Sequence, residues 1–559
     1  MLKPISFKWF QFCLGIAVTC WAVFAFRFIN DLPRTIERPE TLGLLVLLIG
    51  MFTLLLLPVI VRLLERAGPA LFYGLVLTCP LDIGKSWWYI PLEYSGPHHE
   101  FRLTIALILL VMLTIPVVAK AARRTTVSHG FNDTVLPVLL LFLLSAASCF
   151  EASNVSLALF ELFRMATNIL LFFVVTSYVA SERPRVNTFM TVIAVAILIH
   201  GAVAIIEQQS GTSMGISLMG EGDLQTKWGD QNLARSGGLM GYPTLLAPLM
   251  LLYGSVAGAA GLFLPREREW QGSLLGSLLT VSAVTSLAVL VITYTRSAWI
   301  ALVLGIALAL PTTIRLFKNS SSAQKRRVLR IAAVFFIAAV VAGASLRSSI
   351  TERLTRSDSG SAASRVDMMK DAVAMIQDNW LTGVGLNNYS VAMWRYDVTG
   401  VHRWWGANVV VHNLFLLIAA ETGIPSLVIF CLLIYRVLRK GRRSLAVRAI
   451  SPEAILIAGL GLGIICFLIQ SCADASYRFS PGLQRTLWLF MGLLVGYAGW
   501  SESRQECPNR RSPLRHEVDW GSAHSTLTAE QGARGNPMTS QPAGSRQVTQ
   551  SCLLGQDRM

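Results

Sequence analysis

The stretch HNLFLLIAAETGIPSLVIFCLLIYRVLRK, residues 412–440, decides the fold class. Its apolar residues extend over more than the roughly 20 positions that an α-helix needs to cross the hydrocarbon core of a bilayer. The run ends in two arginines and a lysine, which is typical of the cytoplasmic end of a transmembrane helix. We therefore expect residues 412–440 to span a membrane.

The rest of the chain repeats this pattern. Of its 559 residues, 53% are hydrophobic and only 14% are charged, whereas soluble domains are about a quarter charged. Apolar runs of spanning length occur about 14 times, at 9–28, 41–61, 67–81, 101–119, 133–150, 157–180 and 187–207, and from near 239, 272, 297, 329, 412, 453 and 484. The sequence thus predicts an all-α integral membrane protein, a polytopic helical bundle of about 12–14 transmembrane helices.

The charges and cysteines fit a membrane protein better than a nucleic-acid-binding one. The net charge is +16, but the basic residues lie between apolar runs and form no patch on a soluble domain. Nucleic acid is therefore not an expected partner, and the lipid bilayer is. Several of the nine cysteines lie inside apolar runs, and no C-x-x-C pair occurs, so the sequence predicts neither disulfides nor a bound metal or other cofactor.

Basic segments set the topology. Residues 315–330 and 436–448 are rich in Lys and Arg and are expected in the cytoplasm. Alternating the spans from them puts both termini in the cytoplasm and segments 208–238 and 347–411 in the periplasm. The first apolar run has no cleavage site and is expected to remain as an anchor.

Segment 347–411 is too long for a simple connector. It contains an apolar stripe at helical spacing, and Ser364 with Asp367 resembles a capping box at the start of the helix. We expect an amphipathic helix on the membrane surface or over a cavity, ended by the turn residues TGVGLNN at 382–388. The stripe consists of Val366, Met369, Val373, Ile376 and Trp380.

The domain organisation follows from these segments. We expect N-terminal transmembrane helices in 1–200 and a catalytic region with the periplasmic loop 347–411 in 201–440. Residues 441–500 would add C-terminal transmembrane helices. Residues 501–559 are rich in Ser, Gln, Arg and Gly, which predicts a disordered cytoplasmic tail.

Three arginines are candidate ligands for an anion. Arg235, Arg296 and Arg365 all fall on the predicted periplasmic side, where the topology rule does not favour cations. Each alone can be a solvated or snorkelling charge. Together they would suit a lipid-linked diphosphate, because the arginine fork binds phosphate oxygens in pairs.

His412 is the candidate base. It lies at the periplasmic start of its helix, where a neutral imidazole can accept a proton from a sugar hydroxyl; the alternative is an interfacial histidine bonded to a backbone carbonyl. Glu421 comes nine residues later, on the opposite helix face, so the two should not form a dyad. Gly423 and Pro425 predict a kink, with Glu421 paired to a cation at a helix interface.

Other intramembrane charged and ionisable residues leave more than one interpretation open. Glu161 and Arg164 are three residues apart and are expected to pair. His200 and Glu207 remain ambiguous. Polar groups inside spans are also typical of solute pathways, so a transporter or permease for an anionic solute is the alternative function, and a noncatalytic assembly partner is a third.

Several motifs resemble the O-antigen ligase and O-antigen polymerase superfamily of bacterial membrane glycosyltransferases. RSGGL at 235–239 is similar to the family's Arg-x-x-x-Leu element, and TRSAWIALVLG at 295–305 to its Ser-Arg helix start, with Thr295 where Ser is usual. HNLFLLIAAETGIPS at 412–426 is similar to its His-Asn, nine residues, Gly pattern, with Ser426 in the final position. DNWLTGVGLNNY at 378–389 resembles the stretch before it.

The resemblance implies an enzyme without metal or cofactor. It would transfer a glycan from undecaprenyl diphosphate to an acceptor hydroxyl at the periplasmic face of the bacterial inner membrane. Arg235 and Arg296 would hold the diphosphate, and His412 would activate or position the acceptor hydroxyl. The acceptor is an acceptor glycan, the lipid A core in lipopolysaccharide biosynthesis, or a protein hydroxyl. The sequence leaves open ligase, polymerase of O-antigen or exopolysaccharide, and protein glycosylation.

Overall fold

The computed structural model describes residue 59 and residues 61–89, 100–123, 132–216, 235–264, 270–345, 361–397, 399–400, 410–447 and 451–505. All of them fall in one structural unit, Met1–Cys507. The predicted span at 9–28 lies outside the described residues, as does the predicted span at 41–61 apart from residues 59 and 61. Of the predicted disordered tail 501–559, residues 506–559 lie outside as well, but residues 501–505 are helical and continue the last helix to Gln505, so the tail prediction is wrong there.

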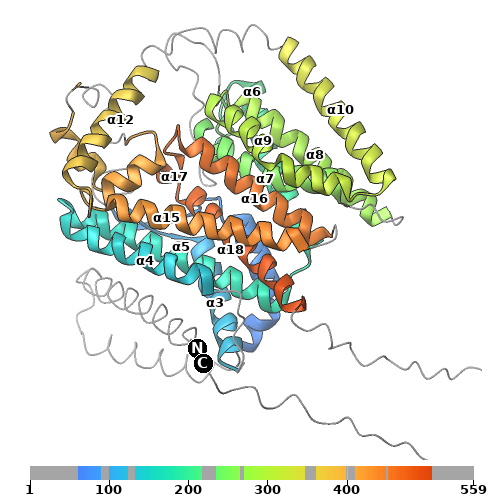
Figure 1. The fold of residues 1–559 in the computed structure, drawn as a ribbon, viewed down its shortest axis with the longest axis horizontal. Helices are drawn as coiled ribbons and strands as arrows, with labels where there is room; N and C mark the ends of the chain where they lie inside the picture. The colour runs from blue at the N-terminus through green and yellow to red at the C-terminus, as the bar shows by residue number, and fades with distance from the viewer. Residues whose placement is uncertain are drawn as a thin grey trace, which may run out of the picture. The chain divides into compact units, whose positions relative to one another are not determined.

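The described chain is built of long helices, as the sequence predicts (Figure 1). These are α3 (Ile105–Arg123), α4 (Asn132–Ser148), α5 (Val155–Glu182), α6 (Val186–Ser210), α7 (Pro243–Phe263), α8 (Trp270–Ile292), α9 (Arg296–Lys318), α10 (Ser322–Ser345), α12 (Ser361–Asp378), α15 (Leu414–Val447), α16 (Pro452–Ser471) and α18 (Pro481–Gln505), with the short helices α13 (Tyr389–Ala392) and α17 (Ser476–Phe479). Among the described residues, nine helices are long and apolar enough to cross a membrane: α3 to α9, α15 and α16. The chain is therefore an all-α polytopic membrane protein.

Three other predicted spans form helices without being among those nine. They are the helix at residues 61–78, α10 and α18. Each carries several charged residues in or near its first or last turns. Such charges lower the hydropathy of a helix, although long Lys and Arg side chains at a helix end can still reach the interface.

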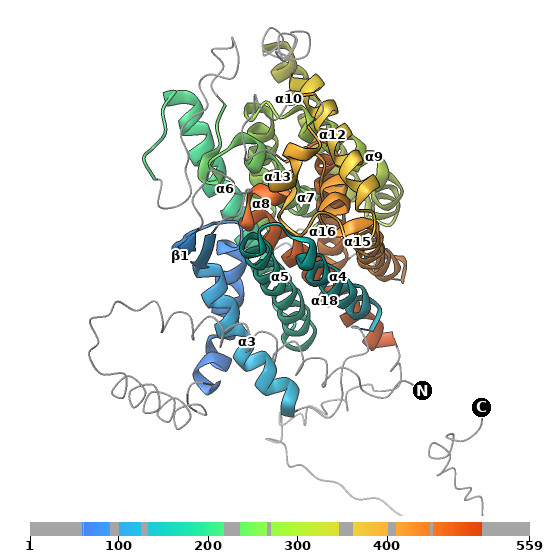
Figure 2. The ribbon, with the colours of Figure 1, turned by 90° about the vertical axis from the view of Figure 1, so that its left-hand side faces the viewer.

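One hairpin departs from the all-α pattern. Strand β1 (Gly84–Tyr89) pairs antiparallel with β2 (Glu100–Thr104), with an irregularity between Ser86 and Trp88. Figure 2 shows β1 beside the end of α3. The span predicted from residue 101 begins at Ile105 instead, because residues 100–104 extend to pair with β1.

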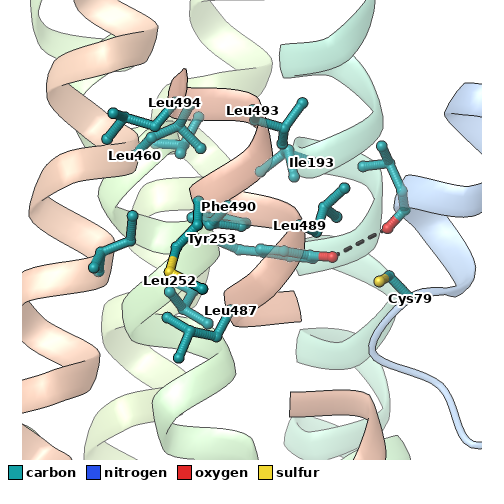
Figure 3. Close-up of a cluster of buried hydrophobic side chains, with 14 of the residues drawn as sticks. Cys79, Ile193, Leu252, Tyr253, Leu460, Leu487, Leu489, Phe490, Leu493 and Leu494 are labelled. Atoms are coloured by element: carbon teal, nitrogen blue, oxygen red, sulfur yellow. Dashed lines mark hydrogen bonds between the residues drawn. The ribbon is translucent and has the colours of Figure 1, made fainter. Parts of the chain in front are cut away.

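Helix α7 lies at the centre of the core, and 78% of its most apolar stretch is buried. It packs against α8 and α16. Gly459 and Gly463 of α16 allow this close approach, because a Cβ on either would lie under 3.0 Å from the α7 backbone. Tyr253 of α7 stacks on Phe490 of α18 and donates a 3.1 Å hydrogen bond to the Val76 carbonyl (Figure 3).

Helix α15 is kinked where the sequence predicts it. Gly423 has φ 83° and ψ 164°, outside the helical region, and Pro425 has no N–H to donate to the Glu421 carbonyl. The preceding segment supplies the missing bonds: Val384 N–H donates to Ala420 O at 2.8 Å and Gly385 N–H to Glu421 O at 3.1 Å. The turn segment 382–388 is therefore hydrogen-bonded to the backbone of α15 at the kink.

Helix α12 exists as predicted, with two differences. It begins at Ser361, so Ser364 lies inside the helix, not at its cap, and Asp367 pairs with Lys370 at 2.8 Å. The predicted apolar stripe is one face, but Val366 and Val373 on it are exposed. The neighbouring residues Met368, Ala372 and Met375 pack with residues of α15, and Met369 and Ile376 of the predicted stripe pack partly against the same cluster.

The predicted cytoplasmic segments lie at one end of the bundle. Arg315 donates to the carbonyl of Ala446, which joins the ends of α9 and α15. Arg327 donates to the Leu264 carbonyl after α7 at 2.9 Å, and Lys120 pairs with Glu182. These contacts are consistent with both basic segments facing one side of the membrane.

Candidate functional site

Arg235 is fixed in a tight loop at the opposite end of the bundle. Its Nε donates to the Thr293 carbonyl at 3.1 Å, and the residue is 7% exposed. The following residues are held by Glu207 of α6, whose carboxylate accepts hydrogen bonds from the Ser236 hydroxyl and, at 2.9 Å, from the Gly238 N–H. This settles the ambiguous Glu207: it anchors the RSGGL loop.

The glycines of this loop are required by its geometry. A Cβ at Gly237 would lie 2.6 Å from the backbone of Gly241, and Gly238 has φ +50°. The loop therefore brings Arg235 to one defined position beside Thr293.

Arg296 opens α9 directly after a strained turn. Tyr294 has φ 49°, a conformation that costs free energy for a residue with a bulky side chain. The Thr295 hydroxyl lies 3.3 Å from the Thr293 carbonyl, the same oxygen that accepts from Arg235. Arg235 and Arg296 are therefore held by one turn, 293–295.

Arg365 of α12 joins this group. Its guanidinium interacts electrostatically with that of Arg296, and its Nη1 donates to the Ala473 carbonyl at 3.4 Å. Two like charges near each other in a partly dry site repel unless an anion lies with them. The three predicted anion ligands thus lie at the same end of the bundle.

His412 lies on the other side of Ala473. Its Nδ1 is 3.8 Å from Oδ1 of Asp474, and its side chain is 25% exposed. The next residue, Asn413, caps α15: its Oδ1 accepts from the Phe415 and Leu416 N–H groups at 3.0 and 3.1 Å. Two of the first N–H groups of α15 are thus occupied by this side chain.

The loop between α16 and α17, residues 472–475, connects the predicted residues. The Cys472 carbonyl accepts from Asn413 Nδ2 at 2.9 Å, the Ala473 carbonyl accepts from Arg365, and the Asp474 carboxylate lies beside His412. The four predicted site residues therefore lie at one end of the bundle: Arg235 contacts the turn that precedes Arg296, Arg296 and Arg365 interact electrostatically, and Arg365 and His412 both lie against this loop.

Asp474 is the site residue that the sequence analysis missed. It is 6% exposed and lies more than 60 positions after His412, in the short connection between two apolar helices. No spacing rule joins the two residues. The available signal was a carboxylate in a short loop on the same predicted side as His412.

Glu421 pairs with a cation, as predicted, and the cation is Arg478 of α17. Arg478 also binds Glu161 Oε1 at 2.7 Å, and Glu161 pairs with Arg164 as expected. Burial lowers the pKa of Arg478 to about 9, which still leaves the guanidinium protonated at neutral pH. This buried network ties α5, α15 and α17 together behind the His412 loop.

Aromatic residues near the site are only partly described. The segment MWRYDVTGVHRWW at 393–405 is rich in aromatic residues. Within it, Trp394 is exposed and Met393 is buried, while residues 398 and 401–409 lie outside the described residues. Nearby, burial and the carboxylates of Asp371 and Asp397 raise the pKa of Tyr389. The Tyr389 hydroxyl therefore stays protonated and donates to the Met368 carbonyl at 3.2 Å.

No group of three or more His, Cys, Asp or Glu side chains that could hold a metal ion occurs within the part of the chain that the structure describes. The buried His200, left open by the sequence, lies on α6. Its carbonyl would lie 3.3 Å from a Cβ at Gly238, so His200 borders the RSGGL loop.

Comparison with known proteins supports the resemblance. Residues 281–431 match the family model described as O-antigen ligase. The matched segment includes Arg296, Arg365 and His412 and excludes Arg235 and Asp474. No curated protein matches the chain. Residues 281–431 are thus similar to O-antigen ligases, which confirms the resemblance to the O-antigen ligase and O-antigen polymerase superfamily.

Proposed function

We propose that the protein is a membrane glycosyltransferase that moves a glycan from undecaprenyl diphosphate to an acceptor hydroxyl at the periplasmic face of the bacterial inner membrane. The observation that supports the proposal is the placement of Arg235, Arg296, Arg365 and His412 around the turn 293–295 and the loop 472–475, at the same end of the bundle. It combines cations for a diphosphate with a base for a hydroxyl at one end of a membrane bundle.

The arginines hold the diphosphate and stabilise it as it leaves. Their forks match phosphate oxygens and keep their charge at any physiological pH. The mutual repulsion of Arg296 and Arg365 is relieved when an anion binds between them. The diphosphate gains charge as the sugar–oxygen bond breaks, so this binding is strongest in the transition state.

His412 acts on the acceptor. The acceptor oxygen attacks the anomeric carbon, the bond from that carbon to the phosphate oxygen breaks, and the hydroxyl proton passes to the imidazole. The charge of Asp474, whose Oδ1 lies 3.8 Å from Nδ1, stabilises the imidazolium that forms. The diphosphate leaves as a weak base, so this scheme needs no metal.

A transfer assay with the purified full chain tests the proposal. The donor is a glycan linked to undecaprenyl diphosphate, the acceptor is lipid A core or a second carrier-linked glycan, and a chelator is present. We expect the glycan to move to one of these acceptors with release of undecaprenyl diphosphate. Loss of transfer on chelation would contradict metal independence.

The same preparation separates the enzyme from the alternative. Reconstituted in vesicles, a permease would carry a free anionic glycan across the bilayer without breaking a glycosidic bond. Transport of this kind with no transfer to any acceptor would favour the permease.

A further inference from the structure

Four charged side chains form a network directly behind the loop 472–475. Arg478 of α17 pairs with Glu421 of α15 and, at 2.7 Å, with Glu161 of α5, and Glu161 also pairs with Arg164. Glu161, Glu421 and Arg478 are buried. Two cations and two anions balance each other in this network, so its role lies in the elements that it holds together.

Stability alone does not account for a buried network of this kind. Taking charges out of water costs free energy that their mutual attraction hardly offsets, and replacing a buried ion pair by apolar residues of similar volume is often neutral or stabilising. A buried pair can instead fix a geometry, because removing one partner leaves an uncompensated charge. The elements joined by these pairs therefore indicate what the network does.

Arg478 connects the loop 472–475 to the helix that follows His412. Its backbone N–H donates to the Ala475 carbonyl at 2.8 Å, at the end of the loop, and its guanidinium pairs with Glu421 of α15. Any movement of Arg478 relative to Glu421 would therefore move the loop relative to α15.

Glu421 is a firm anchor for this connection. Its carbonyl accepts hydrogen bonds from the Ser148 hydroxyl at 2.9 Å and from the Gly385 N–H at 3.1 Å. Its carboxylate also accepts a hydrogen bond from the Tyr389 N–H at 3.4 Å. The residue thus joins α15 to the end of α4 and to the segment that follows α12.

Single hydrogen bonds to backbone carbonyls hold the loop elsewhere. Arg365 donates to the Ala473 carbonyl at 3.4 Å, and the Ser476 hydroxyl, just after the loop, donates to the Thr244 carbonyl at 2.8 Å. Arg478 instead pairs with two carboxylates, and such charge-assisted contacts are about twice as strong as neutral hydrogen bonds. We therefore expect Arg478 to be the main anchor of the loop.

We propose that Arg478 is a positioning residue for glycan transfer: with Glu161 and Glu421 it fixes the distance between the Asp474 carboxylate and the His412 imidazole. This inference rests on the proposed function, because Arg478 acts through the base of that reaction. The carboxylate lies 3.8 Å from Nδ1 and acts by its charge, so its effect on the imidazolium falls as the distance grows.

Steady-state kinetics of the purified full chain test this role with two variants. Arg478→Lys keeps the charge but cannot bind two carboxylates through one planar fork, and Glu421→Gln keeps the size of the side chain but removes its charge. We expect each to lower kcat roughly threefold to tenfold, the range of coupling within one network. KM for the donor should hardly change, because neither residue binds the diphosphate.

Arg327→Lys is the matched control. Arg327 also donates from both ends of its guanidinium, to the Leu264 carbonyl at 2.9 Å and the Gly261 carbonyl at 2.7 Å, but at the other end of the bundle. Its kcat should equal that of wild type. Unchanged kcat in folded Arg478→Lys and Glu421→Gln, or a rise in KM for the donor, would overturn the proposal.

A double-mutant cycle separates positioning from a general loosening of the fold. If Arg478 acts through Asp474, Arg478→Lys should lower kcat in wild type but hardly at all in Asp474→Asn, where the positioned charge is already gone. Equal factors in the two backgrounds would overturn the proposal. If Arg478→Lys does not fold, as judged by its Tm, Glu421→Gln takes its place in the cycle.

Hydrogen exchange followed by mass spectrometry tests the geometry without the reaction. Loss of the anchor raises local opening, so the amides of residues 473–479 should exchange several-fold faster in Arg478→Lys and Glu421→Gln than in wild type and Arg327→Lys. Unchanged exchange would overturn the proposal. If exchange changes as expected but wild type transfers no glycan, the proposed function fails, while the anchoring of the loop by Arg478 stands.

Discussion

Asn413 and Asp474 define the environment of His412. Asn413 takes the helix-capping role and binds the Cys472 carbonyl, so the imidazole next to it is not needed to complete the helix. Asp474 lies 3.8 Å from the imidazole Nδ1. At this distance the carboxylate acts on Nδ1 through its charge and not through a hydrogen bond, and Nε2 is left to act on substrate.

Asp474→Asn tests this electrostatic role. The substitution keeps the size of the side chain but removes the charge that stabilises an imidazolium, so we expect kcat for transfer to fall roughly tenfold or more, within the range of general base catalysis. KM for the donor should hardly change, because Asp474 does not bind the diphosphate. Steady-state kinetics measure both. A rise in KM at unchanged kcat would instead make Asp474 part of the binding site.

Arg296→Lys tests diphosphate binding. Lysine keeps the charge but loses the bidentate fork, so use of the donor should fall by roughly 10²-fold or more, as for loss of one preorganised donor. The measurement is kcat/KM for the donor. Arg123→Gln, at the other end of the bundle, serves as the unaffected control. If kcat/KM of Arg296→Lys equalled that of wild type, Arg296 would not be a ligand of the diphosphate.

At the scale of elements, α15 is hydrogen-bonded at its kink to the segment that follows α12. The carbonyls freed by Gly423 and Pro425 are taken by N–H groups of Val384 and Gly385, and Ile424 N–H donates back to the Trp380 carbonyl at 2.8 Å. The kink thus fixes the connection from α12, which carries Arg365, to α15, which follows His412.

Gly423→Ala should disrupt these backbone hydrogen bonds at the kink of α15. Its Cβ would lie 2.1 Å from the Leu381 carbonyl oxygen, and its φ of +83° disfavours any side chain. We expect destabilisation of about 1–3 kcal/mol from the backbone alone, seen as a lower Tm of the purified chain. Gly258→Ala in α7 is the control, because its Cβ would meet nothing within 4 Å, and its Tm should be unchanged or higher. Equal Tm values for the two variants would contradict this account of the kink.

Sequence patterns predicted this element only in part. The kink follows from Gly423 and Pro425. Helix faces do not decide the orientation of His412, because α15 begins at Leu414 and His412 precedes it, although His412 and Glu421 form no pair with each other, as predicted. The neighbours of His412 and Glu421 do not follow from the sequence. Asp474 and Arg478 lie between α16 and α18, and only the packed fold brings them to α15. Similarly, the apolar stripe of α12 was found, but which face packs on the protein depends on α15.

At the scale of the whole molecule, the spans were the most predictable feature, because their apolar length is a local property. The hairpin was missed, since its pairing of 84–89 with 100–104 joins short segments without clear alternation. The four predicted site residues come together, in part because alternating spans bring distant loops to the same end of a bundle.

Cysteine labelling tests the topology. Cys472 is exposed in the loop beside His412, and Asn319 is exposed at the other end of the bundle. A membrane-impermeant maleimide added from the periplasm should label a chain that retains Cys472 as its only cysteine. It should spare a chain whose only cysteine is Asn319→Cys until the membrane is opened. The reverse pattern would place the site in the cytoplasm.

The most direct test of the central claim compares donor binding and glycan transfer in wild type and His412→Ala. A base for the acceptor hydroxyl acts in the chemical step and not in holding the diphosphate. We predict that His412→Ala binds undecaprenyl-diphosphate glycan nearly as tightly as wild type but loses most transfer. Full transfer by His412→Ala, or equal loss of binding and transfer, would contradict the account.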